Sequence, residues 1–130
     1  MIASPDIWDR CYDEGWKGQI VDEGFAHPAK MSYSLSHRIY EHAFRSGWLK
    51  PGDRVIDPFG GICGTALHAA IQGVVWIGCE LEEKFHDLGN QNIDLWQRMY
   101  GHYPEWVRPT LHCGDSRRLA EVLGMADLCV

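Results

Sequence analysis

The chain has 130 residues, of which 45% are hydrophobic and 23% charged, and its formal net charge at neutral pH is −6. This length and composition predict one globular domain that buries about two thirds of the surface of its unfolded chain. The acidic balance argues against a domain that holds nucleic acid by itself, because Lys and Arg supply most non-specific affinity for phosphates. We expect neither a signal peptide nor a membrane span, and therefore a cytoplasmic location.

The predicted elements alternate between short apolar strands and helices. Residues 1–26 form a lead-in that packs either on the domain or against another segment, and the sequence leaves both options open. The predicted helices begin near Ser34, Gly64, Leu81 and Leu119. The predicted strands are residues 55–57, 74–80, 109–113 and 126–130. This alternation predicts an α/β, Rossmann-like domain whose parallel sheet has helices on both faces.

The first strand runs directly into a glycine-rich turn at Gly60, Gly61 and Gly64. Such a turn lets backbone N–H groups approach a ligand, and the following helix directs its positive end toward it. We expect Gly60 in particular to have a positive φ and to face the ligand. The turn therefore predicts a site for a ligand with a polar or charged end.

The spacing of the turn excludes two common nucleotide sites. The glycines do not fit Gly-x-Gly-x-x-Gly, and Thr65 follows Gly64 without the lysine of a phosphate-binding loop. Asp57, at the end of the strand, would repel a pyrophosphate but suits an ammonium group. Glu80 ends the second strand about twenty residues later, where α/β nucleotide sites place an acid on ribose hydroxyls.

The run Asp57-Pro58-Phe59-Gly60-Gly61 resembles the first cofactor motif of the amino-group DNA methyltransferases, which commonly reads Asp-Pro-Phe-x-Gly-x-Gly-Thr. Cys63 stands where this family usually has a small residue. Upstream, His27-Pro28-Ala29-Lys30 resembles the family's N-terminal cofactor motif, with its lysine one place earlier than in the commonest form. Asp115, after the third strand, resembles the acid that accepts from the adenine amino group.

The resemblance implies that the cofactor is S-adenosylmethionine and that the fold is a methyltransferase fold. The ammonium group of the cofactor would lie near Asp57, and the carboxylate of the cofactor would lie near Thr65. The candidate cofactor-binding residues are His27, Pro28, Ala29, Lys30, Asp57, Pro58, Phe59, Gly60, Gly61, Thr65, Glu80, Leu81, Asp115 and Ser116.

Each of these candidates also has a structural interpretation. Asp57 could cap the turn, Glu80 could favour the start of the third helix, and Asp115 with Ser116 could cap the fourth. Residues 27–31 could be a proline turn that introduces the first helix. Phe59 either stacks near the cofactor or fills the core.

In the same family, the fourth strand is followed by a Pro-Pro-aromatic loop that holds the target amino group, and this sequence contains no such loop. We therefore expect residues 27–130 to be a truncated S-adenosylmethionine-binding domain with no catalytic residue of its own. The resemblance implies methylation of adenine N6 or cytosine N4 in DNA, with DNA bound through a C-terminal part or a complementing chain. A non-catalytic or split-gene cofactor-binding protein, or a methyltransferase for RNA, protein or a small molecule, remains an alternative.

The cysteines and histidines predict no metal site and no disulfide framework. The five cysteines contain no Cys-x-x-Cys pair, and the seven histidines form no His-Glu-x-x-His pattern. We expect the cysteines at 63, 79, 113 and 129 to be small buried apolar groups in or beside strands.

Overall fold

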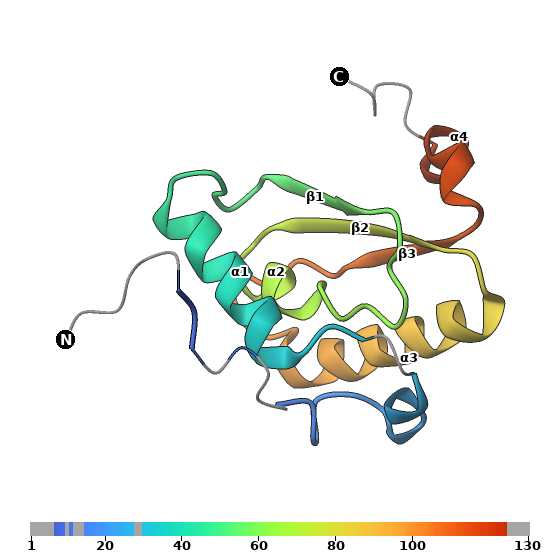
Figure 1. Ribbon diagram of the computed structural model, residues 1–130, viewed down its shortest axis with the longest axis horizontal. Coiled ribbons are helices and arrows are strands. Elements are labelled where there is room, and N and C mark those ends of the chain that lie inside the picture. The colour runs from blue at the N-terminus through green and yellow to red at the C-terminus, as the bar shows by residue number, and fades with distance from the viewer. Residues whose placement is uncertain (1–6, 10, 12–14, 28–29, 125–130) are drawn as a thin grey trace.

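A parallel sheet forms one layer of the molecule in the computed structural model, which describes residues 7–9, 11, 15–27 and 30–124 (Figure 1). Within these residues the sheet has three strands, β1 (Arg54–Asp57), β2 (Val75–Glu80) and β3 (Thr110–Cys113), in the order β1-β2-β3. Ile56 lies opposite Ile77, and Gly78 lies opposite Leu111. The predicted α/β class and parallel sheet are confirmed, and the expected strand at 126–130 lies outside the described residues.

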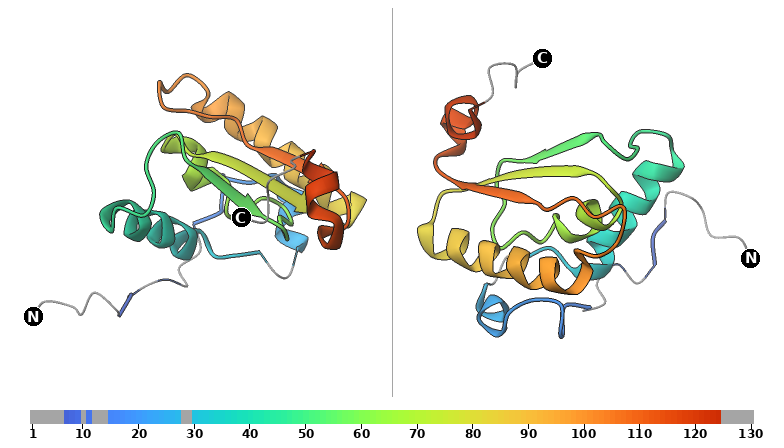
Figure 2. Two further views of the ribbon diagram at one scale, coloured as in Figure 1. Left: turned by 90° about the horizontal axis from the view of Figure 1, so that it is seen from above. Right: turned by 180° about the vertical axis from the view of Figure 1, so that it is seen from behind.

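The helices α1 (Tyr33–Arg45), α2 (Leu67–Ile71) and α3 (Glu83–Tyr100) lie together on one face of the sheet (Figures 1 and 2). We expected helices on both faces. Because β1, β2 and β3 are consecutive neighbours, right-handed crossovers place α2 and α3 on the same face. The short α4 (Leu119–Leu123) lies beyond the carboxyl end of β3, after the 3-10 turn η2 (Ser116–Arg118).

Local capping explains where α1 begins and ends. The Ser32 hydroxyl accepts a hydrogen bond from the Leu35 backbone N–H at 3.1 Å, which satisfies one of the unpaired donors of the first turn. Gly47 follows the helix with a φ of 74°, a conformation that glycine adopts without steric cost. The predicted helix near Ser34 is therefore confirmed, with a start one residue earlier.

The helix α2 is shorter than the sequence indicates. It begins at Leu67 rather than near Gly64, because residues 61–66 form turns and not an α-helix. Gly61 and Cys63 both have left-handed backbone conformations, with φ values of 55° and 72°. The helix begins only after these successive turns of residues 61–66.

Three fully buried tryptophans dominate the core between the sheet and the helices, namely Trp16, Trp76 and Trp96. Asn92, on α3, is also fully buried. Its side-chain oxygen accepts from the Val21 N–H at 2.8 Å, and its nitrogen donates to the Ile62 carbonyl at 3.0 Å. Both ends of the buried Asn92 amide therefore have hydrogen-bond partners in the core.

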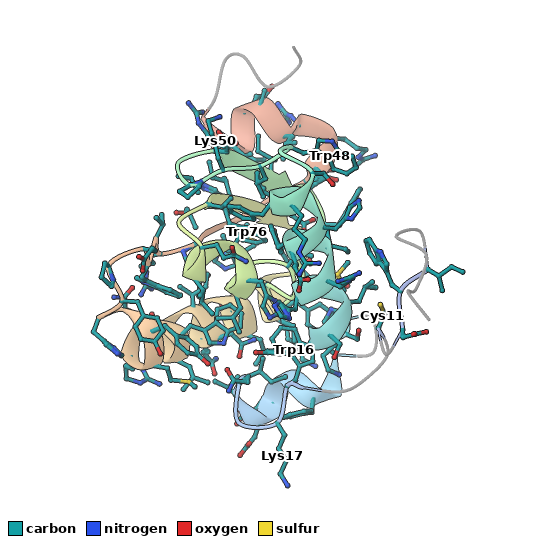
Figure 3. All side chains as sticks on the ribbon, turned by 90° about the vertical axis from the view of Figure 1, so that its left-hand side faces the viewer. Cys11, Trp16, Lys17, Trp48, Lys50 and Trp76 are labelled. Carbon is teal, nitrogen blue, oxygen red and sulfur yellow. The ribbon has the colours of Figure 1, made fainter. Side chains whose placement is uncertain are left out.

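The lead-in residues from 15 to 26, including the 3-10 turn η1 (Asp22–Ala26), pack onto the domain. The Trp16 indole N–H donates to the Met31 carbonyl at 2.9 Å, and the Trp96 indole N–H donates to the Gln19 carbonyl. Figure 3 shows Trp16 turned inward, whereas Lys17 beside it points away from the molecule. This part of the lead-in therefore belongs to the same core as the sheet.

Cysteine burial follows the expectation at two of the three described strand and turn positions. Cys63 and Cys79 are buried, whereas Cys113, at the end of β3, is exposed. Among the described residues no group of three or more metal-ligating side chains occurs. None of the described helices is long and apolar enough to cross a membrane.

His68, on α2, is a buried titratable group at the helix interface, with only 6% of its surface exposed. Its Nδ1 lies 3.1 Å from the Ser36 hydroxyl, and none of the described residues offers a partner to its Nε2. Burial, and then the nearby His37, lower the pKa of His68 to about 4. The folded protein therefore keeps this imidazole neutral.

This pKa predicts a loss of stability in mild acid. The unfolded chain binds a proton on His68 near pH 6.5, whereas the folded chain does so only near pH 4, so stability falls as the pH drops between these values. In urea unfolding, His68→Gln should remove about 1–2 kcal/mol of the loss between pH 7 and pH 5. His102→Gln, at an exposed histidine, is the control. Equal pH dependence of His68→Gln and the unmodified protein would refute this assignment.

Candidate functional site

Two adjoining cavities lie at the carboxyl ends of the strands. The larger, about 370 Å³, is called the glycine-loop cavity, and it is lined by His27, Lys30, Met31, Asp57, Phe59, Gly60, Gly61, Ile62, Gly64, Thr65 and Glu80. The smaller, about 260 Å³, is called the strand-tip cavity, and it is lined by Pro58, Phe59, Cys79, Glu80, Leu81, Glu82, Gly114, Asp115 and Ser116. All described candidate residues line one cavity or both, and Pro28 and Ala29 lie outside the described residues. Phe59 and Glu80 belong to both walls.

Asp57 ends β1 and holds the start of the turn. Its Oδ1 accepts from the Phe59 N–H at 3.0 Å, and its Oδ2 accepts from the Thr65 hydroxyl at 2.6 Å. The carboxylate therefore caps the turn, as one interpretation of the sequence proposed, and it also lines the glycine-loop cavity. Capping and ligand binding are compatible, because each carboxylate oxygen has more than one lone pair.

Thr65 is fixed from two further sides. The Trp76 indole N–H donates to its hydroxyl oxygen at 3.0 Å, and the Tyr40 hydroxyl of α1 donates to its carbonyl at 2.6 Å. Burial, and then the negative charge of Asp57, raise the pKa of Tyr40 well above its ordinary value. Tyr40 therefore remains a neutral donor throughout the physiological pH range.

Glu80, the last residue of β2, ties the turn to the sheet. Its Oε1 accepts from the Gly61 N–H at 3.0 Å, and its Oε2 accepts from the Glu82 N–H at 2.8 Å. The side chain lies before α3, whose first residue is Glu83. Glu80 thus stands between the two cavities with its carboxylate oriented by two backbone donors.

The glycines of the turn have different functions from those that we expected. Gly60 has no positive φ; its N–H donates to the Cys79 carbonyl at 2.7 Å, and an added Cβ would stand 2.8 Å from Leu111 Cδ1. Its missing side chain therefore lets the turn approach the sheet. The expected positive φ of Gly60 is wrong, whereas Gly60 does line the glycine-loop cavity. Gly61 has the positive φ, and its Cβ position lies 3.6 Å from His27 Nε2.

Cys63 occupies an uncommon backbone conformation for a residue with a side chain. Its φ is 72°, and its side chain is completely buried. Burial, and then the charges of Asp57 and Glu80, raise the pKa of its thiol well above the ordinary value. The group is therefore a packed, protonated thiol under the cavity floor and not a nucleophile.

Asp115 starts η2 and pairs with its own neighbour. Its carboxylate accepts from the Arg117 backbone N–H at 2.9 Å and from the Arg117 guanidinium at 2.5 and 2.9 Å. These side-chain and backbone hydrogen bonds lower the pKa of Asp115 to about 2. Asp115 therefore caps η2 and not the fourth helix, whose N-cap is Arg118, and its ionised carboxylate also lines the strand-tip cavity.

The remaining candidates surround the glycine-loop cavity from the lead-in side. The ring of His27 packs edge-on against Phe85, with centroids 4.3 Å apart, and Lys30 Nζ lies 3.4 Å from the His27 carbonyl. Phe59 is 78% exposed, so it does not fill the core. It forms an apolar wall at the boundary of the two cavities.

Two residues that shape the site were not identified from the sequence, namely Tyr40 and Trp76. Alternation along β2 was a signal for Trp76, because residues 76, 78 and 80 point to one face of the sheet. Tyr40 could not be found in this way, because its contact depends on how α1 packs against the turn.

The family described as DNA methylase, of the N6/N4 type, matches residues 3–91, which include Asp57 and Glu80 but not Asp115. The orphan methyltransferase M.BamHII from Bacillus amyloliquefaciens is 31% identical in an alignment of 100 residues that covers 74% of this chain and 36% of that protein. The chain thus spans about a third of the length of this relative.

The glycine geometry predicts two different kinds of damage. Gly60→Val should cost about 3 kcal/mol of unfolding free energy, because the side chain overpacks against Leu111 and Trp76. Gly61→Ala should cost about 1–2 kcal/mol through its positive φ. Gly47→Ala is the matched control for the effect of positive φ alone, because Gly47 has a φ of 74° and no atom lies near its Cβ position. Urea unfolding checks both values, and wild-type stability in Gly60→Val would contradict the packing described above.

Proposed function

The chain belongs to the N6/N4 family of DNA methylases, and from this we propose that its two adjoining cavities bind S-adenosylmethionine for the methylation of an amino group in DNA. The observation that carries the proposal is the position of Glu80, whose oriented carboxylate lies on the wall between the two cavities. A ligand with a charged amino-acid end, a central ribose and an adenine matches two cavities that are separated by a carboxylate.

The amino-acid end of the cofactor fits the glycine-loop cavity. Asp57 supplies a negative charge for the ammonium group, and Lys30 supplies a positive charge for the carboxylate. The Thr65 hydroxyl donates to Asp57, so it serves the carboxylate of the protein rather than that of the ligand. This arrangement differs from the sequence-based expectation, which placed Thr65 beside the ligand carboxylate.

The nucleoside end fits the strand-tip cavity. Glu80 accepts from the ribose hydroxyls, as the acid at the end of the second strand does in α/β nucleotide sites. The exposed ring of Phe59 offers an apolar surface to the adenine. The ionised Asp115 accepts from the adenine amino group, which requires a carboxylate oxygen to exchange its Arg117 donor for the ligand.

When bound, the cofactor supplies an activated methyl group. The residues described here bind and orient it, and none of them is proposed as a base or nucleophile. Five arginines each pair with an acidic side chain, namely Arg38, Arg45, Arg108, Arg117 and Arg118. Because the net charge of the chain is −6, we propose that a further part of the enzyme or a complementing chain holds the DNA duplex.

Removal of one charge tests the proposal. Glu80→Gln should weaken S-adenosylhomocysteine binding about fivefold to thirtyfold in titration calorimetry, because a charge-assisted hydrogen bond becomes a neutral one. Glu83→Gln, at the exposed start of α3, should bind like the unmodified chain. Binding of NAD in place of S-adenosylhomocysteine, or equal affinity of the two variants, would count against the proposal.

A further inference from the structure

A buried tryptophan on the central strand is connected to the candidate cofactor carboxylate through one hydroxyl group. Trp76 is fully buried, and its indole N–H donates to Thr65 Oγ1 at 3.0 Å. Thr65 Oγ1 in turn donates to Asp57 Oδ2 at 2.6 Å. Figure 3 shows Trp76 in the interior of the molecule, away from Trp48 and the other labelled surface residues.

The chemistry of the three groups fixes which of them donates and which accepts in this series of hydrogen bonds. An indole nitrogen can only donate, so the Thr65 oxygen must accept from Trp76. The single hydroxyl proton of Thr65 is then free to point at Asp57, which accepts it as a carboxylate. The other carboxylate oxygen accepts from the Phe59 N–H at 3.0 Å, so both oxygens of Asp57 have a protein donor and the plane of the carboxylate is fixed.

The strand makes room for the indole at a specific position. A Cβ on Gly78 would stand 2.2 Å from Trp76 Cη2 and 2.6 Å from Cζ3, so any larger residue would displace the ring. The same ring edge lies 3.3 Å from the Cβ position of Gly60 in the turn. The glycines at 60 and 78 therefore let the indole lie beneath the turn, where its N–H reaches Thr65.

We propose that Trp76 is a positioning residue that acts through Thr65 to hold Asp57 in the orientation that receives the ammonium group of the cofactor. The inference rests on the proposed function and deepens it. Packing alone requires that the buried N–H find an acceptor, but not that the acceptor be the side chain that holds Asp57. Trp76 thereby selects ligands that carry the amino-acid end.

Two ligands separate positioning from packing. S-adenosylhomocysteine carries the ammonium group, whereas methylthioadenosine has the same nucleoside and no amino-acid end. Trp76→Phe, measured by titration calorimetry well below the melting temperature, should weaken S-adenosylhomocysteine about fivefold and methylthioadenosine less than twofold. Thr65→Val should do the same, and the double variant should bind no more weakly than Thr65→Val alone, because Trp76 acts only through the hydroxyl.

Trp96→Phe is the matched control, because Trp96 is equally buried and its N–H donates to the Gln19 carbonyl outside both cavities. It should leave both affinities unchanged. If Trp76→Phe does not fold, Thr65→Val and Thr65→Ser still decide the question. The ratio of the affinities for S-adenosylhomocysteine and methylthioadenosine should fall in Thr65→Val and recover in Thr65→Ser.

Equal weakening of both ligands by Trp76→Phe or by Thr65→Val, or additive effects in the double variant, would overturn the positioning role while the proposed function stands. An unmodified chain that binds neither ligand would overturn both. An unchanged affinity of Thr65→Val for S-adenosylhomocysteine would likewise overturn the role of the chain of hydrogen bonds.

Discussion

Three hydrogen bonds hold the glycine turn against the rest of the domain, and the candidate site depends on them. The Gly60 N–H donates to the Cys79 carbonyl, the Gly61 N–H donates to Glu80, and the Ile62 carbonyl accepts from Asn92. The partners come from the backbone of β2, its last side chain and the buried face of α3. Because each bond uses the main chain of the turn, the path of the turn is fixed independently of most of its side chains.

This anchoring explains why the site has two compartments. With the turn drawn onto the end of β2, the Glu80 carboxylate faces both the glycine-loop cavity and the strand-tip cavity, and Phe59 is left exposed at their boundary. The lead-in supports the same turn from the other side, since Val21 donates to Asn92. Val21 therefore helps to hold the turn, and the described part of the lead-in packs on the domain, which is one of the two options that the sequence left open.

The sequence predicted what depends on strand order and spacing, but not what depends on packing across the molecule. Asp57, Glu80 and Asp115 follow three parallel strands, so their convergence could be predicted from the carboxyl ends of those strands. The different functions of Gly60 and Gly61 could not, because they depend on how closely the turn approaches Leu111. The late start of α2 could not be predicted either, because residues 61–66 form turns that no residue preference indicates. Trp76, Arg117 and Tyr40 act through contacts that only the folded chain defines.

The central claim is that the two cavities form one cofactor site divided at Glu80. A titration of the isotope-labelled chain with S-adenosylhomocysteine, followed through backbone amide signals in NMR, tests it most directly. If the two cavities form one site, the amide signals of Phe59, Gly61, Glu82, Gly114 and Ser116 should all shift together with one affinity. Shifts confined to one cavity, or two groups of amides that saturate at different ligand concentrations, would contradict it.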